Sequence, residues 1–314
     1  MSACLICGGS QTVTMFRGGD RLYHTTEEQF AVVRCAQCGM SRLDPQPAPE
    51  RLGRYYPQNY WFAPDRSAAS RLEESYRRLV LRDHVSFVAR ALADSKASGP
   101  LLDVGCGGGL FLGMMRDRGF RVAGLDFSAE AAKVAWTRQG VGVVAGDFER
   151  APLPKGAFAA ITMFHVVEHL YDPAAYFGVA RELLAKDGRL VVQVPNASSI
   201  QARALGHRWN GFDVPRHLNN FRDRDLEALL VRAGFEVLRR KYFSLRDNPA
   251  GLASSLAPGL DPMARRVRQV PESAAARLAK DLAYFGLVVG SVPFAVLEAL
   301  LRAGSSVMME ARPR

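Results

Sequence analysis

The chain has 314 residues, 48% of them hydrophobic, and a formal net charge of +10. A chain of this length and composition can fill a core, so it is not disordered by default, and it has room for one large domain and a small one. The basic residues are scattered, so the charge does not choose among nucleic acid, an anionic membrane and a phosphorylated substrate. No positively charged leader with a short apolar core opens the sequence, so we expect a cytoplasmic protein.

Four cysteines near the start form two pairs, Cys4-x-x-Cys7 and Cys35-x-x-Cys38, each followed by glycine. Two thiolate pairs separated by a loop suit a structural Zn²⁺ with tetrahedral geometry. A pair of disulfides is disfavoured in an intracellular protein, and a redox C-x-x-C needs only one pair. We therefore predict a zinc-binding domain over 1–42 that draws much of its folding energy from the metal.

A connector and a leading helix are predicted over 43–99. Its Pro-rich and aromatic part, 43–61, is expected to pack on the following domain, because large aromatic side chains are usually buried and a free linker would leave them in water. From Ser70 to about Asp94, apolar residues recur at helical spacing.

Beyond the connector, short apolar runs alternate with helical stretches. We predict strands at 100–104, 121–125, 141–145, 157–163, 188–194 and 235–243, with a final strand in 305–314. Such alternation indicates a mainly parallel sheet with right-handed crossovers, whose ligands lie beyond the carboxyl ends of the strands.

The first of these strands runs into a glycine-rich turn, LLDVGCGGGLF, with the spacing D-x-G-x-G-x-G from Asp103 to Gly109. Glycines let the backbone approach a ligand closely, and Asp126, at the end of the next strand, can accept hydrogen bonds from a ribose diol. A dinucleotide fingerprint needs Gly or Ala where this chain has Leu110, which disfavours an NAD-dependent reductase.

With its flanking segments this turn resembles the first motif of class I S-adenosylmethionine (SAM) methyltransferases. Later motifs match in order over roughly 100–245: GDF at 146–148, FHVVEHL at 164–170 and KDGRLVVQVPN at 186–196. The resemblance implies an α/β fold with a doubly wound, Rossmann-like, seven-stranded sheet whose last strand is antiparallel. The small N-terminal zinc-binding domain and a helical insertion before the last strand would be added to it.

The resemblance also implies roles in binding the cofactor SAM. Asp126 would hold the ribose, Asp147 the adenine amino group, and Phe148 would pack on the adenine, unless it is an ordinary core residue. The loop from Asp103 to Gly109 would carry the methionine end. The full predicted set is Asp103, Gly105, Cys106, Gly107, Gly109, Asp126, Phe127, Asp147, Phe148 and His165.

The segment His165-Val-Val-Glu168-His169 is the sharpest catalytic candidate. It also spells an inverted zinc-protease motif, but that motif needs a long helix, whereas this segment ends a strand. It is similar to segments in ubiquinone-pathway O-methyltransferases, where an acidic residue before E-H can hold a divalent ion, and in sugar C-methyltransferases, which also begin with a four-cysteine zinc domain. His165 departs from the former pattern. We predict that His169 is the general base and that Glu168 orients it or binds the acceptor; alternatively, both satisfy backbone groups at a helix start.

Polar and aromatic residues also gather in the loop 208–221. We predict that Trp209, Arg216 and His217, together with Tyr60 of the connector, contact the acceptor. The loop could equally be an inert cover, with His217 capping the next helix.

The insertion, 246–304, ends in the apolar stretch KDLAYFGLVVGSVPFAVLEALLR. Its uncharged part, Leu282–Leu297, is 16 residues and contains Pro293, whereas a bilayer takes about 20, so a transmembrane helix is not expected. We expect a helical lid packed against the sheet edge. The alternative is peripheral contact of 282–301 with a membrane or a lipid-like acceptor, with Arg265, Arg266 and Arg268 nearby for phosphate.

The sequence thus predicts a SAM-dependent methyltransferase acting on a small-molecule, sugar or lipid-linked acceptor, by O- or C-methylation, in a glycan, lipid or natural-product pathway. The alternative is a zinc-ribbon nucleic-acid-binding or scaffold protein with a non-catalytic nucleoside pocket. Residues 1–40 carry only Arg17, Arg21 and Arg34 as fixed cations, so no specific nucleic acid is expected.

Overall fold

The structure, a computed structural model, describes residues 3–56 and 68–314. Its centre is a seven-stranded sheet with the order β10-β11-β8-β7-β4-β5-β6. The neighbouring pairs are parallel except those of β11, which is antiparallel to both β8 and β10. The strands are β4 (Leu101–Val104), β5 (Val122–Asp126), β6 (Val143–Ala145), β7 (Phe158–Phe164), β8 (Leu184–Pro195), β10 (Phe235–Lys241) and β11 (Ser306–Pro313). The predicted α/β fold is therefore confirmed.

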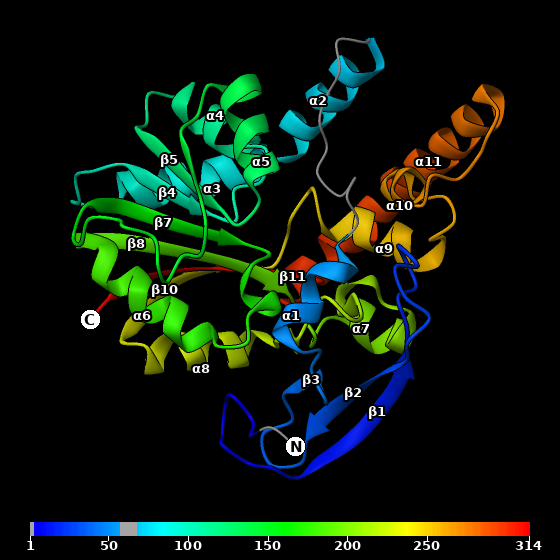
Figure 1. The fold of residues 1–314 in the computed structure, drawn as a ribbon, viewed down its shortest axis with the longest axis horizontal. Helices are drawn as coiled ribbons and strands as arrows, with labels where there is room; N and C mark the ends of the chain where they lie inside the picture. The colour runs from blue at the N-terminus through cyan, green and yellow to red at the C-terminus, as the bar shows by residue number, and fades with distance from the viewer. Residues whose placement is uncertain (1–2, 57–67) are drawn as a thin grey trace.

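Helices cover both faces of this sheet (Figure 1). On one face lie α3 (Arg82–Ala93), α4 (Leu110–Arg116) and α5 (Ala129–Val134), and on the other α6 (Pro173–Leu183) and α8 (Asp223–Arg232). Because both faces are covered, the strands are continuous apolar runs, and Leu102, Ile161 and Val192 are wholly buried. From β4 the chain first adds β5 and β6 on one side of the sheet and then β7 and β8 on the other. At such a switch point the loops leave the strands in opposite directions, so a ligand crevice forms at the carboxyl end of β4.

The single helix expected from Ser70 to Asp94 is two helices, α2 (Ala68–Val80) and α3, separated at Leu81. α3 packs its buried Val85 and Val88 on the body of the protein, whereas α2 projects away from it (Figure 1). The apolar periodicity continues through the break, which is why the sequence did not mark it.

A second sheet, with the order β1-β2-β3-β9, lies below the first (Figure 1). It consists of β1 (Thr12–Gly18), β2 (Phe30–Cys35), β3 (Ser41–Leu43) and β9 (Asn219–Asn220), all antiparallel. β9 comes from the loop that follows β8, so this sheet of the N-terminal segment is completed by a segment about 180 residues later. The remaining short elements are α1 (Pro49–Leu52), α7 (Ile200–Leu205), 3-10 turns at Gly53–Tyr55, Val167–His169, Gly206–Arg208 and Asn210–Phe212, and a π-helical turn at Ala135–Gln139.

The insertion before β11 contains α9 (Asn248–Leu256), α10 (Pro262–Val267) and the long α11 (Ala274–Leu300). The 27 residues of α11 are long and apolar enough to cross a membrane by length and composition, with a mean hydropathy of 1.7 over its most apolar window. The prediction that this stretch is too short to span a bilayer was wrong, because it counted only the 16 uncharged residues Leu282–Leu297 and not the whole helix. The packed lid is also wrong for most of the helix, since only 22% of that window is buried.

Candidate active site

The glycine turn follows β4 directly and requires glycine at several positions. Gly105, Gly107 and Gly109 have φ angles of +72°, +52° and +73°, a region that other residues rarely adopt. A Cβ atom on Gly105 would lie 2.6 Å from a Val166 methyl carbon, so there is no room for a side chain. The turn therefore brings bare backbone to the carboxyl edge of the sheet.

Asp126 ends the neighbouring strand and faces this turn. Its Oδ2 accepts the Gly107 N–H at 2.8 Å, and its Oδ1 accepts the Ser128 N–H at 2.9 Å. Each carboxylate oxygen has a second lone pair, so Asp126 can still accept hydrogen bonds from a diol. Phe127, the next residue, is 67% exposed at the same edge.

Two titratable side chains lie at this turn: Asp103, buried in β4, and Cys106, half-buried in the turn itself. Asp103 accepts a hydrogen bond of 2.6 Å from the Thr162 hydroxyl, and burial, with the nearby charge of Asp126, raises its pKa to about 7. Burial also raises the pKa of the Cys106 thiol, so this cysteine is a weak nucleophile, in keeping with a packing role.

The two residues predicted to contact the adenine, Asp147 and Phe148, differ in burial. Asp147, after β6, is exposed, and its side chain accepts the Glu149 N–H at 2.8 Å. Phe148 is 1% exposed and belongs to the hydrophobic core, where its ring centroid lies 5.4 Å from that of Tyr176. The structure thus favours the core alternative for Phe148, and its contact with adenine is not shown.

His165 follows β7 in a left-handed conformation, with φ of +56°. Its Nδ1 lies 3.0 Å from Glu168 Oε1 and its Nε2 3.4 Å from Asp247 Oδ2. Burial lowers the pKa of His165, but the two carboxylates outweigh this and raise it to about 9. This shift favours the imidazolium form of His165 at neutral pH, whose Nδ1–H donates to the Glu168 carboxylate.

His169 has the opposite electrostatic environment. Burial, assisted by the neighbouring His217, lowers its pKa to about 4, so it is uncharged at neutral pH. Its Nδ1 lies 3.0 Å from the Arg216 carbonyl oxygen and 2.8 Å from the Tyr56 hydroxyl. Tyr56 also contacts Phe127 beside the glycine turn, with ring centroids 6.2 Å apart. This contact links His169 to the carboxyl edge of the sheet.

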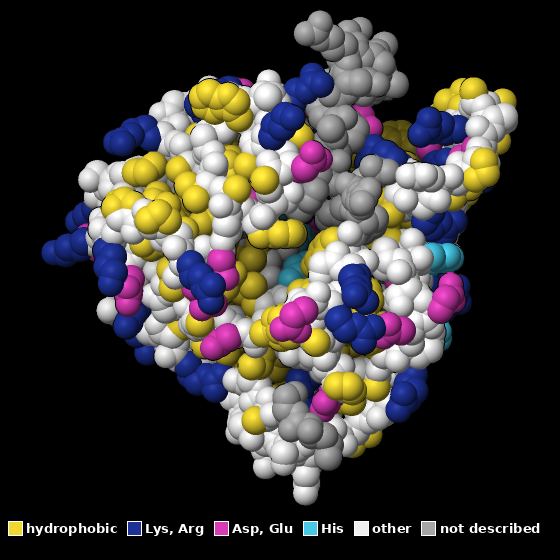
Figure 2. All heavy atoms as spheres, in the orientation of Figure 1, with side chains coloured by type: hydrophobic (Ala, Val, Ile, Leu, Met, Phe, Trp, Pro, Cys, Tyr) yellow, Lys and Arg dark blue, Asp and Glu magenta, His cyan; other side chains and the backbone are white. Residues whose placement is uncertain are grey.

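Glu168, His169 and His217 form one cluster, in which His169 is half-buried and the other two are buried, although His217 comes from a distant loop. The His169 and His217 ring centroids are 4.7 Å apart, and His217 Nε2 lies 4.0 Å from Glu168 Oε1. One ligand atom of each residue lies within 4.8 Å of those of the other two, so the cluster could hold a divalent cation as well as move a proton. Figure 2 shows a hollow near the centre of one face with a histidine side chain inside it.

The prediction that Arg216 contacts the acceptor is wrong. Its side chain is completely buried, and its N–H groups donate five hydrogen bonds, to the carboxylates of Asp20 and Asp213 and to the Tyr55 carbonyl oxygen. A guanidinium has five N–H donors, so none is left for a ligand. Arg216 instead ties the loop that carries His217 to the N-terminal segment.

Three carboxylates support this site, and sequence reasoning missed two of them, Asp20 and Asp247, whereas Asp213 belongs to the polar loop 208–221. Asp247 holds His165, while Asp20 and Asp213 hold Arg216. Asp247 follows shortly after β10, and polar residues beyond the carboxyl end of a parallel strand are a signal that could have identified it. Asp20 gave no signal, because its partner lies 196 residues away.

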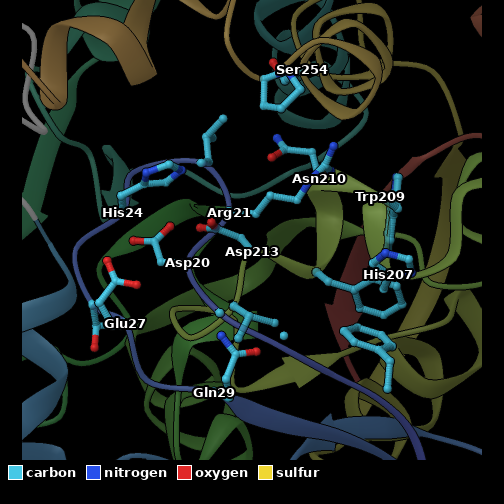
Figure 3. A pocket seen from close by; sticks show the side chains of 18 residues that line it. Asp20, Arg21, His24, Glu27, Gln29, His207, Trp209, Asn210, Asp213 and Ser254 are labelled. Atoms are coloured by element: carbon cyan, nitrogen blue, oxygen red, sulfur yellow. The ribbon is translucent and has the colours of Figure 1, made fainter. Parts of the chain in front are cut away.

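Beside Asp213 lies a pocket of about 340 Å³, enclosed by the β1–β2 loop, the loop 206–214 and α9 (Figure 3). Trp209 is only 3% exposed and packs edge-on against Phe212, but it lines this pocket together with Asn210 and His207. Asp213 Oδ2 is in turn 3.9 Å from His217 Nε2. Tyr60, the other predicted acceptor contact, lies outside the described residues.

The four N-terminal cysteines converge. The Sγ atoms of Cys4 and Cys38 are 3.5 Å apart, as are those of Cys7 and Cys35, and all four lie within 4.8 Å of one another. Zinc with bonds of about 2.3 Å to four sulfurs holds them about 3.8 Å apart, so the cluster fits a zinc ion. All four are free thiols, which does not support the disulfide alternative.

The sheet order, the glycine turn and the facing carboxylate of Asp126 together define a Rossmann-like methyltransferase fold. A family described as a methyltransferase domain matches residues 73–240, more than half of the chain, and the chain belongs to this family.

Curated relatives cover part of the chain. A probable S-adenosylmethionine-dependent methyltransferase of Mycolicibacterium smegmatis is 31% identical over 186 residues, which are 57% of this chain and 61% of that protein. Malonyl-[acyl-carrier protein] O-methyltransferase of Serratia marcescens is 33% identical over 157 residues, 49% of this chain and 61% of that protein. Ubiquinone biosynthesis O-methyltransferase of Xanthomonas axonopodis pv. citri is 28% identical over 153 residues, 45% of this chain and 64% of that protein. The chain thus spans less than two thirds of each of these relatives.

Among solved structures, geranyl diphosphate C-methyltransferase from Streptomyces coelicolor A3(2), in complex with Mg²⁺, geranyl diphosphate and S-adenosyl-L-homocysteine, aligns with a TM-score of 0.51. The alignment covers 85% of this chain and 99% of that one at 18% identity. At this identity the likeness shows the shared fold alone.

Proposed function

We propose that the chain is a SAM-dependent methyltransferase that methylates an oxygen or carbon of a small-molecule, sugar or lipid-linked acceptor. The observation that carries the proposal is the Asp126 carboxylate facing the left-handed glycine turn at the carboxyl end of β4. Membership in the methyltransferase family and the similarity to small-molecule O-methyltransferases support it.

The cluster of Glu168, His169 and His217 suits the proton transfer that such a reaction needs. When bound, SAM would supply an electrophilic methyl carbon and would leave as S-adenosylhomocysteine once the acceptor has taken the methyl group. His169, uncharged at neutral pH, takes the acceptor proton, while Glu168, held by the imidazolium of His165, stabilises the charge that His169 gains. The pocket beside Trp209 and Asp213 is the proposed acceptor pocket.

The proposal is tested directly with methyl-tritiated SAM and an extract of metabolites and lipids from the source cells. We expect protein-dependent transfer of label into an extractable small molecule or lipid, and calorimetric binding of SAM. A protein that binds SAM but labels nothing would favour the scaffold alternative, and one that does not bind SAM would exclude both.

SAM affinity should depend on pH through Asp103. The methionine end of SAM carries an ammonium group, which favours the ionised carboxylate, but the pKa of Asp103 without ligand is about 7. Below that pH, Asp103 must release its proton when SAM binds, which weakens binding. The Kd for SAM should therefore rise up to about tenfold per pH unit between about pH 7 and pH 6, and level off above about pH 8. Calorimetry at several pH values measures this, and Asp103→Asn should flatten the profile. A wild-type Kd that is constant over this range would contradict the prediction.

We further propose that Cys4, Cys7, Cys35 and Cys38 hold one structural Zn²⁺. Elemental mass spectrometry should find one zinc per chain, and Cys35→Ser should lose the metal and lower the Tm by at least about 5 °C, because the segment has little core of its own. Cys106→Ser is the matched control and should retain zinc. Wild-type protein that lacks zinc after expression with the metal supplied would refute the assignment.

A further inference from the structure

α11 presents an unusually apolar surface. Eighteen large hydrophobic side chains are exposed among the described residues with described side chains, and nine of them lie between 278 and 301. We call this set the α11 apolar face: Leu278, Leu282, Phe285, Val289, Phe294, Val296, Leu297, Leu300 and Leu301. No charged residue occurs from Leu282 to Leu297, so over 16 residues the exposed side of the helix offers water no ionic group. Soluble proteins rarely leave so large an apolar area uncovered.

The helix is not loose, because its other side is packed. Val288, Ser291, Ala295 and Glu298 are buried at helical spacing, and α11 contacts α9. Near its carboxyl end, Glu298 accepts hydrogen bonds from the Gln201 backbone N–H at 2.9 Å and from the Gln201 side-chain amide at 2.6 Å. This end is therefore fixed to the segment that follows β8.

The amino-terminal half of α11 is tied to the same body. Asp281 pairs with Arg265 of α10, and α10 packs Ala264 and Val267 against Leu22 and Tyr23 of the N-terminal segment. A helix that spans a bilayer has its two ends on opposite sides. Since α11 is anchored to one folded body near both ends, it can lie along a membrane surface but cannot cross it while the protein stays folded.

The charge of the molecule selects among possible partners for this face. The net charge of +10 opposes association of two copies and favours an anionic partner. Arg302 is exposed at the carboxyl end of the helix, where it lines a groove of about 720 Å³ with Val296 and Leu300. The cations of β10 also line this groove, but each is paired with a carboxylate, so Arg302 carries the charge argument at this end. Arg277 is exposed at the amino-terminal end. An apolar strip flanked by cations matches an anionic bilayer, which has phosphates at the surface and acyl chains beneath.

We propose that α11 is an interfacial helix that docks the protein on an anionic membrane, with the α11 apolar face buried at the boundary between headgroups and acyl chains. Docking itself does not require methyl transfer. Its corollary, that the acceptor is a lipid or lipid-linked molecule, rests on the function proposed above.

The experiment is cosedimentation of the full chain with vesicles of phosphatidylcholine alone and of phosphatidylcholine mixed with phosphatidylglycerol. We expect binding to the mixed vesicles that is at least about tenfold tighter than to the neutral ones and weakens with salt. The double variant Leu282→Asp/Val289→Asp should lose at least about tenfold in vesicle affinity, because each substitution places a charge in the α11 apolar face, which docking would bury in the membrane.

The matched control is Val13→Asp/Trp136→Asp, which adds the same two charges at side chains that are 63% and 66% exposed on other elements. The control should bind vesicles as weakly as Leu282→Asp/Val289→Asp if only net charge matters. It should bind like the wild type if the α11 apolar face is the contact. Unchanged SAM affinity in both variants shows that they fold and separates this test from that of the activity. Wild-type protein that ignores the anionic vesicles, equal losses in both variants, or a wild-type dimer that only the α11 variant dissociates, would overturn the proposal.

Discussion

Replacing Asp126 with alanine is expected to raise the Kd for SAM at least about 100-fold. Two hydrogen bonds from a ribose to a carboxylate contribute roughly 1.5–3 kcal/mol each, and the variant also frees the Gly107 N–H, which Asp126 now holds at 2.8 Å. Isothermal titration with SAM and with S-adenosylhomocysteine measures the effect. Both ligands should lose affinity to a similar degree, since both carry the same ribose.

Two further variants make this result specific. Asp126→Asn keeps the size and one acceptor and should lose less affinity than the alanine variant. Asp117→Asn removes a carboxylate at the exposed end of α4, away from the turn, and should bind SAM like the wild type. If Asp126→Ala binds SAM as tightly as the wild type, the nucleoside is not held at this edge of the sheet and the proposed function fails.

The second large effect is expected from His169→Gln, which should lower the rate of methyl transfer at saturating SAM by about 10²–10⁴-fold. Glutamine keeps polar atoms near the Tyr56 hydroxyl and the Arg216 carbonyl oxygen but cannot take a proton. The Kd for SAM should change less than about twofold. Loss of SAM binding together with turnover would instead assign His169 a structural role.

The pH profile of the wild type gives an independent measure of the same base. Because burial and the neighbouring His217 lower the pKa of His169 to about 4, it stays unprotonated, and therefore active, until the pH falls through about 4. At saturating SAM the acid limb should accordingly lie well below the ordinary histidine value of about 6.5. Chelation provides the control: a strong chelator that abolishes turnover without removing the proposed zinc of the four cysteines would show that the Glu168–His169–His217 cluster works through a cation.

The parts of the molecule that could be predicted from sequence are those coded locally. The strands from β4 to β8 are short apolar runs, and the glycine turn with Asp126 is read from spacing over about 25 residues. Both follow from backbone geometry, which neighbouring residues determine. For the same reason, the sequence predicts that Glu168 and His169 lie beyond the end of a strand at the carboxyl edge of the sheet.

What could not be predicted depends on residues that meet only in the folded chain. Arg216 looked available for a ligand because its partner Asp20 is 196 positions away. The pKa values of His165 and His169, four residues apart, shift in opposite directions: burial lowers both, but Asp247 outweighs it at His165, whereas His217 adds to it at His169. Asp247 and His217 come from different loops. Likewise, the apolar content of α11 was evident, but its exposure depends on how few neighbours the tertiary structure gives it.

The pairing of β3 with β9 has a consequence for control of the enzyme. β9 begins two residues after His217, and the Asp20–Arg216 ion pair fastens the other side of the same loop, so the cysteine cluster and the acid–base machinery are mechanically coupled. Loss of the proposed Zn²⁺, or crosslinking of its thiols, would therefore disturb the loop that carries His217. In the proposed methyltransferase, we expect such a change to lower turnover more than it lowers SAM affinity.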